Sequence, residues 1–171
     1  MKELKFEEVL SVMRLFTTKT DLTPKWNNDK PAWMAEPYFA KGYMCATNGA
    51  VGIFIDPTKF DWDIPVVLDT YEKGYPKLPK SLPLEKRRPI TAEWLSENIS
   101  DINECGYWTI NIGEAQYYEE FWRPIKAAFF LLGAKEITMM TEATEEGPLV
   151  MELMDGITVV IMPYLEEEDR L

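Results

Sequence analysis

Apolar residues recur at helical spacing in two stretches of the chain, and each stretch is followed by short β-rich runs. The first stretch is residues 2–17 and the second is residues 117–133. Because their apolar positions fall on one side of a helix, both predict an amphipathic helix. The second helix is predicted to begin at Pro124, or to be kinked there, and to stop at Gly133. The two stripes are Phe6, Val9, Leu10, Met13 and Phe16, and Phe121, Ile125, Ala128, Phe129 and Leu132.

Two Gly-containing turns separate the β-rich runs that follow these helices. They are Asn48-Gly49 in "YMCATNGAVGIFI" and Asp155-Gly156 in "LVMELMDGITVVIMP". Such dipeptides reach positive φ at both central turn positions with least strain, so each predicts a tight hairpin. The run "EITMMTE" predicts one further strand before the second hairpin. Helix, strands and tight turn therefore occur twice, which predicts a pseudo-repeat whose halves share negligible sequence identity.

Residues 57–90 differ from the rest of the chain because they are dense in proline and show little periodicity. We interpret them as an insertion or long excursion, with Thr91 capping a short helix after it. This is the one clearly basic stretch of the chain, and two readings stay open: a solvated loop, or a contact with nucleic acid or an acidic partner. Its basic residues are Lys73, Lys77, Lys80, Lys86, Arg87 and Arg88.

Length, composition and charge indicate how many domains the chain forms and which kinds of partner it can bind. A chain of 171 residues with 46% hydrophobic residues is predicted to form one domain with its own core. No apolar run approaches the roughly 18 residues of a membrane span, so we expect a cytoplasmic protein that does not contact membranes. The net charge of −11 opposes adhesion to nucleic acid over the whole surface but leaves room for a local basic face.

The chain has no histidine and only two cysteines, which excludes Ser-His-Asp triads, Cys-His pairs and ordinary zinc sites. Acidic pairs such as Asp61 with Asp63, or the run from Glu166 to Asp169, have the chemistry to hold a divalent cation, although clustered surface carboxylates are usually solvated. No phosphate-binding glycine loop is present. We therefore predict no catalytic residue, no metal and no cofactor, and we expect that the protein is not an enzyme.

Two stretches resemble one domain of the bacterial DNA polymerase III sliding clamp, the β clamp. "GYMCATNGAVGIFID" (42–56) is similar to a family strand ending in Ala-Thr-Asp/Asn-Gly, and residues 117–164 are similar to the end of the family's third domain. There a helix precedes a strand, a Gly-Pro turn, a strand, and a last strand ending in Met-Pro. The resemblance implies an α+β, DNA clamp-like fold over residues 1–171, with two amphipathic helices on a curved antiparallel sheet.

The resemblance also implies two contact surfaces. In the clamp family the helices face duplex DNA, and the matching basic residues here are Lys5, Arg14, Arg123 and Lys126. Ordinary solvated helix faces are the alternative for them. A pocket beside the family's last strand captures peptides of replication and repair proteins, and the matching residues are Val160, Met162, Pro163 and Tyr164. Filling of the core at strand spacing is the alternative for Val160 and Met162.

Two hypotheses for function follow. The first is a non-enzymatic, sliding-clamp-like module of DNA metabolism that binds duplex DNA, peptides of replication proteins, or both, with ring closure requiring a homo-oligomer. The second is a protein–protein interaction module unrelated to replication, which uses the aromatic and basic excursion. Its candidate contacts are Trp62, Tyr71, Tyr75, Lys77, Lys80, Lys86, Arg87 and Arg88.

Overall fold

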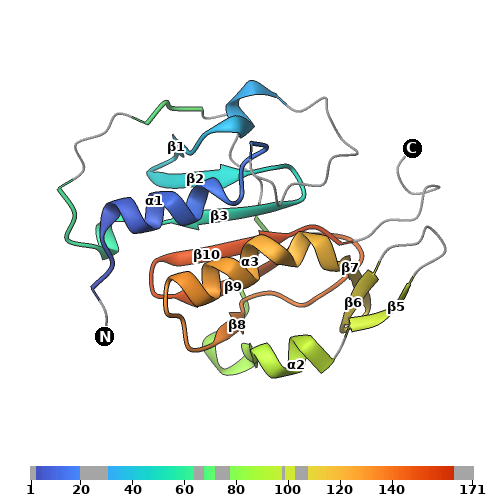
Figure 1. Ribbon diagram of the computed structural model, residues 1–171. Helices are drawn as coiled ribbons and strands as arrows, with labels where there is room; N and C mark the ends of the chain where they lie inside the picture. Colours follow the sequence, from blue (N-terminus) through green and yellow to red (C-terminus); the bar gives the residue numbers. More distant parts are fainter. Residues whose placement is uncertain are drawn as a thin grey trace.

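The computed structural model describes residues 3–19, 31–63, 68–71, 78–97, 99–102 and 108–163, which form an α+β fold (Figure 1). Its helices are α1 (Phe6–Arg14), α2 (Ala92–Glu97) and α3 (Glu119–Leu131), with 3-10 turns η1 (Ala32–Ala35), η2 (Pro57–Lys59) and η4 (Leu84–Lys86). Its strands are β1 (Tyr38–Ala40), β2 (Tyr43–Thr47), β3 (Val51–Ile55), β4 (Arg88–Ile90), β5 (Ile99–Ile102), β6 (Trp108–Ile112), β7 (Ala115–Tyr118), β8 (Ile137–Met139), β9 (Leu149–Met154) and β10 (Ile157–Ile161).

The described strands form a large sheet of seven and a small sheet of three. The large sheet has the order β1-β2-β3-β10-β9-β8-β4, and every neighbouring pair in it is antiparallel. Helix α1 precedes β1, β2 and β3, whereas α3 precedes β8, β9 and β10. A helix followed by three strands thus occurs twice along the chain, and the two units meet at the β3–β10 pair.

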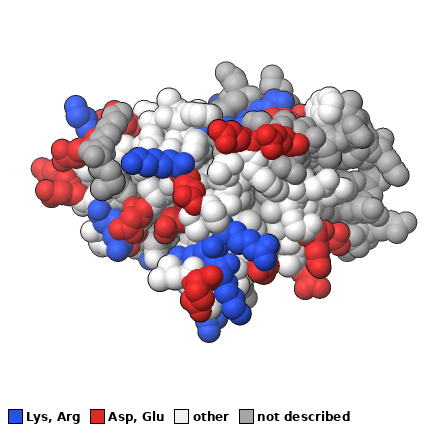
Figure 2. Space-filling model, turned by 90° about the horizontal axis from the view of Figure 1, so that it is seen from below, with Lys and Arg blue, Asp and Glu red and all other residues white. Residues whose placement is uncertain are grey.

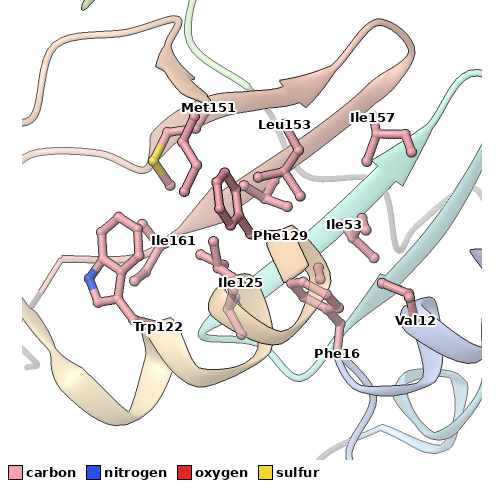
Figure 3. Packing of buried hydrophobic residues seen from close by; sticks show 14 of the residues in the cluster. Val12, Phe16, Ile53, Trp122, Ile125, Phe129, Met151, Leu153, Ile157 and Ile161 are labelled. Atoms are coloured by element: carbon pink, nitrogen blue, oxygen red, sulfur yellow. The ribbon is translucent and has the colours of Figure 1, made fainter. Parts of the chain in front are cut away.

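Helices α1 and α3 lie side by side on one face of the large sheet (Figure 1). The apolar stripes predicted from the sequence face this sheet, as the buried side chains of Phe16, Ile125 and Phe129 show (Figure 3). Val12, which was not part of the predicted stripe, is buried there as well. Burial of each such side chain stabilises the fold by about 1.5–3 kcal/mol. Helix α3 begins at Glu119, so Pro124 lies inside it and not at its start.

The opposite face of the sheet carries a second, smaller apolar cluster. Alternate residues of a strand point to opposite faces, so Cys45, Phe54, Val150 and Val160 lie away from the helices. Tyr38 and Ala40 complete this cluster from β1, and the partly buried Trp33, Leu78 and Met140 pack against it. Both faces of the sheet therefore bury apolar residues.

The predicted turn geometry is wrong at both Gly-containing hairpins. Positive φ occurs at Gly49 (91°) and Gly156 (88°), whereas Lys41 is the only non-glycine with positive φ among the described residues. Asn48 instead uses its side chain: Oδ1 accepts hydrogen bonds from the amides of Ala50 and Val51, at 2.9 and 3.1 Å. This Asx turn replaces the expected two-residue turn because it satisfies two backbone donors.

The turn with positive φ at both central residues joins β1 to β2. It consists of Lys41 (φ 50°) and Gly42 (φ 83°), and it directly follows the pairing of Ala40 with Tyr43. This turn was not predicted from the sequence. A Lys-Gly pair lacks the Asn or Asp that usually marks such a turn.

Residues 57–87, here called the strap, are described at both ends and near the middle. Trp62 stacks on Phe60 with ring centroids 4.2 Å apart, and its Nε1 donates to the Leu4 carbonyl at 2.7 Å. Residues 69–71 then hydrogen-bond to Phe39 along the outer edge of β1. Leu78 packs on the face opposite the helices, and the strap leads into β4, which pairs with β8.

The small sheet packs beside α3 and was not predicted from the sequence. Its order is β5-β6-β7, and it precedes α3 directly. Tyr117 of β7 meets Trp122 of α3 edge-to-face, with ring centroids 6.2 Å apart. Both side chains are fully buried, and neither the Tyr117 hydroxyl nor Trp122 Nε1 has a hydrogen-bond partner within the described residues.

We expect Gly156→Ala to lower the free energy of unfolding by about 1–3 kcal/mol, because a Cβ at φ 88° is strained and would lie 2.8 Å from Lys59 Cβ. Urea unfolding measures this. Gly42→Ala is the matched control, since Gly42 has a similar φ (83°) but open space around it. Equal losses for the two variants would show that the contact with Lys59 contributes nothing.

We expect Tyr117→Phe to raise the free energy of unfolding at pH 7 by about 1 kcal/mol, because it removes a buried hydroxyl that lacks a partner. Burial also raises the pKa of Tyr117 above its usual value of about 10. Above about pH 10 the tyrosine ionises in the unfolded chain but not in the folded one, so the free energy of unfolding falls as pH rises. Phenylalanine does not ionise, so the stability gain of Tyr117→Phe should grow in this pH range.

Urea unfolding at neutral pH and at about pH 10.5 measures both effects, since a tyrosine with the usual pKa of about 10 is mostly ionised in the unfolded chain at the higher pH. The exposed Tyr71 provides the control variant, Tyr71→Phe, for which we expect a change below about 0.5 kcal/mol. A loss of stability in Tyr117→Phe at neutral pH would contradict the assignment of an unpartnered hydroxyl.

Candidate functional site

The candidate DNA-contact residues of α3 are already paired with an acidic neighbour. Arg123 Nη2 lies 3.3 Å from Glu119 Oε2, and Lys126 Nζ lies 3.6 Å from Glu119 Oε1. One carboxylate thus serves both cations across one or two turns of the helix. These exposed or half-exposed pairs contribute little to stability, on the order of 0–1 kcal/mol, but they lower the positive potential available to a phosphate.

The candidate cations Lys5, which directly precedes α1, and Arg14, within α1, are more available to a phosphate than those of α3. Lys5 and Arg14 are exposed, and no described residue forms a salt bridge with either side chain. Their surroundings are nevertheless balanced, because α1 also carries Glu7 and Glu8 and α3 also carries Glu119 and Glu120. The helix face formed by α1 and α3 therefore holds four candidate cations against four acids and is close to neutral.

The four residues predicted to form a peptide pocket differ in exposure. Val160 is only 7% exposed and belongs to the apolar cluster opposite the helices, whereas Met162 is 39% exposed. The Met162 amide donates to the Ala50 carbonyl at 2.8 Å, which fixes the end of β10 beside the β2–β3 turn. Pro163 is buried and Tyr164 lies outside the described residues. Among the three described members of this set, Met162 is the one whose side chain is open to a partner.

The basic residues of the excursion gather near its end, around η4 and β4. Lys80, Lys86 and Arg88 are exposed, while Arg87 is half-buried and donates from Nε to the Leu82 carbonyl at 3.1 Å. Lys77 lies outside the described residues. Seen from the side that carries η4, β4 and α2 in Figure 1, Lys and Arg side chains gather at one place on the surface (Figure 2). The structure therefore separates these cations from the helix face.

Of the aromatic residues proposed as partner contacts, Trp62 has a structural role. Its ring stacks on Phe60 and meets Phe6 edge-to-face, and its Nε1 donates a hydrogen bond to the Leu4 carbonyl. Tyr71 is 38% exposed and packs edge-to-face on Tyr38, with centroids 6.0 Å apart. Tyr75 lies outside the described residues. Contact with a partner through the strap would therefore use its basic end more readily than Trp62.

The acidic residues considered as cation ligands are exposed or lie outside the described residues. Asp61 and Asp63 are exposed, and nowhere in the described ranges do three or more Cys, Asp or Glu side chains gather in a way that would hold a metal ion. Cys45 is buried. The run from Glu166 to Asp169 lies outside the described residues. Among the helices described, none combines the length and apolar character needed to cross a bilayer.

Comparison with known proteins finds no family model, no curated protein and no solved structure that matches this chain. The resemblance to the sliding clamp therefore rests on the sequence stretches 42–56 and 117–164. In the structure these stretches correspond to β2–β3 and to the segment from β7 to β10.

We expect Trp62→Ala to lower the free energy of unfolding by about 2–3 kcal/mol, because it removes the stack on Phe60 and the hydrogen bond to Leu4. Trp62→Phe should cost about 1 kcal/mol, since it loses mainly the hydrogen bond. Thermal unfolding measures both. Trp108→Ala is the control, as Trp108 is 51% exposed and should change stability little. Equal effects at the two tryptophans would contradict a structural role for Trp62.

Proposed function

We propose that this chain is a non-enzymatic, clamp-like module of DNA metabolism that binds DNA, short peptides of replication proteins, or both. The observation that supports this best is the repeated unit of one helix and three strands, placed symmetrically about the β3–β10 pair with both helices on one face. The stretches that resemble the clamp fall within this repeated frame. A sheet backing two exposed helices is the arrangement that the resemblance implies for contact with DNA.

Contact with DNA would use Lys5, Arg14, Arg123 and Lys126. Because the acids of α1 and α3 balance these cations, binding should be weak and should fall steeply as salt rises. Peptide binding would use Met162, whose exposed side chain lies at the end of β10. An exposed apolar anchor beside a fixed backbone suits a short peptide, since little ordering is needed on binding.

We expect the module to act as a monomer that docks on its partners. A ring built by pairing sheet edges needs open strands, but residues 69–71 already occupy the outer edge of β1. The other edge, β4, is three residues long and contains Pro89, which has no amide to donate. Both edges therefore offer few backbone groups to a second copy.

Light scattering with and without primed duplex DNA, together with peptide binding by fluorescence anisotropy, tests the proposal. We expect a monomeric mass and weak binding to a polymerase-derived clamp-binding peptide that falls about tenfold in Met162→Ser. Leu131→Ser, which changes an apolar residue of α3 that is more exposed than Met162, should bind the peptide as well as the unmodified chain.

DNA binding at low salt should weaken several-fold in Arg14→Glu, because the substitution reverses an unpaired charge on the helix face. A chain that binds neither the peptide nor primed DNA at low salt would contradict the proposed function and leave only the fold. A stable ring-sized oligomer would instead contradict the expectation of a monomer.

A further inference from the structure

The end of the strap presents an exposed leucine among basic side chains. Leu84 in η4 is 78% exposed, the highest value among the large hydrophobic residues described. Lys80, Lys86 and Arg88 are exposed within a few residues of it. We call these four residues, together with the half-buried Arg87, the strap-end patch. Leu84 therefore exposes apolar surface to water, and a partner that buried this surface would gain binding free energy.

The backbone beneath this patch is fixed before any partner arrives. The Leu82 amide donates to the Met140 carbonyl at 2.6 Å, and Arg87 Nε donates to the Leu82 carbonyl. The 3-10 turn η4 adds bonds from Lys86 to Pro83 and from Arg87 to Leu84. Pairing of β4 with β8 then anchors the end of the segment. Because these groups are ordered already, a ligand would bind at a low entropic cost.

The local charge differs in sign from that of the whole chain. Residues 78–91 contain four cations and one acid, Glu85, so their net charge is +3, and the chain total of −11 leaves −14 for the remainder. A long polyanion such as duplex DNA would extend beyond the patch onto this acidic surface and be repelled. A short anionic ligand would contact the patch alone.

The apolar content of the patch also favours a peptide over a single-stranded nucleic acid. Residues 78–91 contain no aromatic side chain on which a base would stack. Phosphate contacts do not require Leu84, whereas a peptide that combines carboxylates with an apolar side chain matches both features of the patch.

We propose that the strap-end patch binds a short acidic peptide, with one apolar side chain on Leu84 and flanking carboxylates on Lys80, Lys86 and Arg88. This surface is distinct from Met162 and from the helix face. It therefore adds a docking site that does not depend on binding of DNA or of a clamp-type peptide.

The test uses the full chain and three labelled ten-residue probes in fluorescence anisotropy at low salt. The first probe is rich in Glu with a central Leu, the second replaces this Leu by Ser, and the third replaces the Glu residues by Gln. We expect the first to bind at least about fivefold more tightly than the other two. Equal binding of all three probes would overturn the proposal.

Variants of the chain then locate the site. Leu84→Ser should bind the first and second probes equally, because the side chain that distinguishes them is lost. The double variant Lys86→Glu, Arg88→Glu should bind the first probe about tenfold more weakly than the unmodified chain. Lys59→Glu and Leu131→Ser change exposed residues that belong to none of the proposed binding surfaces, so they are the matched controls. Both should bind the first probe within about twofold of the unmodified chain. Unchanged binding in the patch variants, or equal losses in the controls, would overturn the assignment of the surface.

A duplex of 20 base pairs decides between the two anionic partners. If the patch binds acidic peptides, the duplex should compete poorly with the first probe. A duplex that competes fully, and that loses affinity in the Lys86→Glu, Arg88→Glu variant, would overturn the proposal in favour of nucleic acid. Thermal unfolding of each variant verifies that these exposed substitutions leave the fold intact.

Discussion

The antiparallel pairing of β3 with β10 is the constraint on which the rest of the structure depends. It joins strands more than 100 residues apart, with Ile53 opposite Val159 and Ile55 opposite Ile157. Both residues of each pair face the helices, so this central pair forms the floor on which α1 and α3 pack. The outer strands of each unit extend from it on either side. Loss of this register would turn the apolar residues of one whole unit away from the core.

The two faces of the large sheet have different roles because of this arrangement. One face is covered by two amphipathic helices whose outer surfaces carry balanced charges. The other face is covered by loops, including η1 and the strap. Exposed side chains lie at the margins of this loop-covered face, at Met162 and in the strap-end patch. Surfaces open to a partner therefore lie both on the helices and around the loop-covered face, and the charge on them differs.

The sequence predicted α1, α3 and the hairpin strands because their periodicity reports burial on one side. Thr91 was also predicted correctly as a cap, since its Oγ1 accepts the Trp94 amide at 3.0 Å. Turn geometry was not predictable in the same way, because Asn48 satisfies backbone donors with its side chain. The path of the strap depends on contacts such as that of Trp62 with Leu4, 58 residues away in the sequence, which no local pattern reveals.

The same limits apply to the candidate site. Pairing of Arg123 with Glu119 follows from their spacing on a helix and was visible in the sequence, whereas burial of Val160 depends on packing across the loop-covered face. One segment, the strap continued by β4, also protects strands at both sides of the large sheet: residues 69–71 lie along the outer side of β1, and β4 is the edge strand that pairs with β8. A single proteolytic cut within it would free two strand edges at once and turn a protected sheet into a template for aggregation.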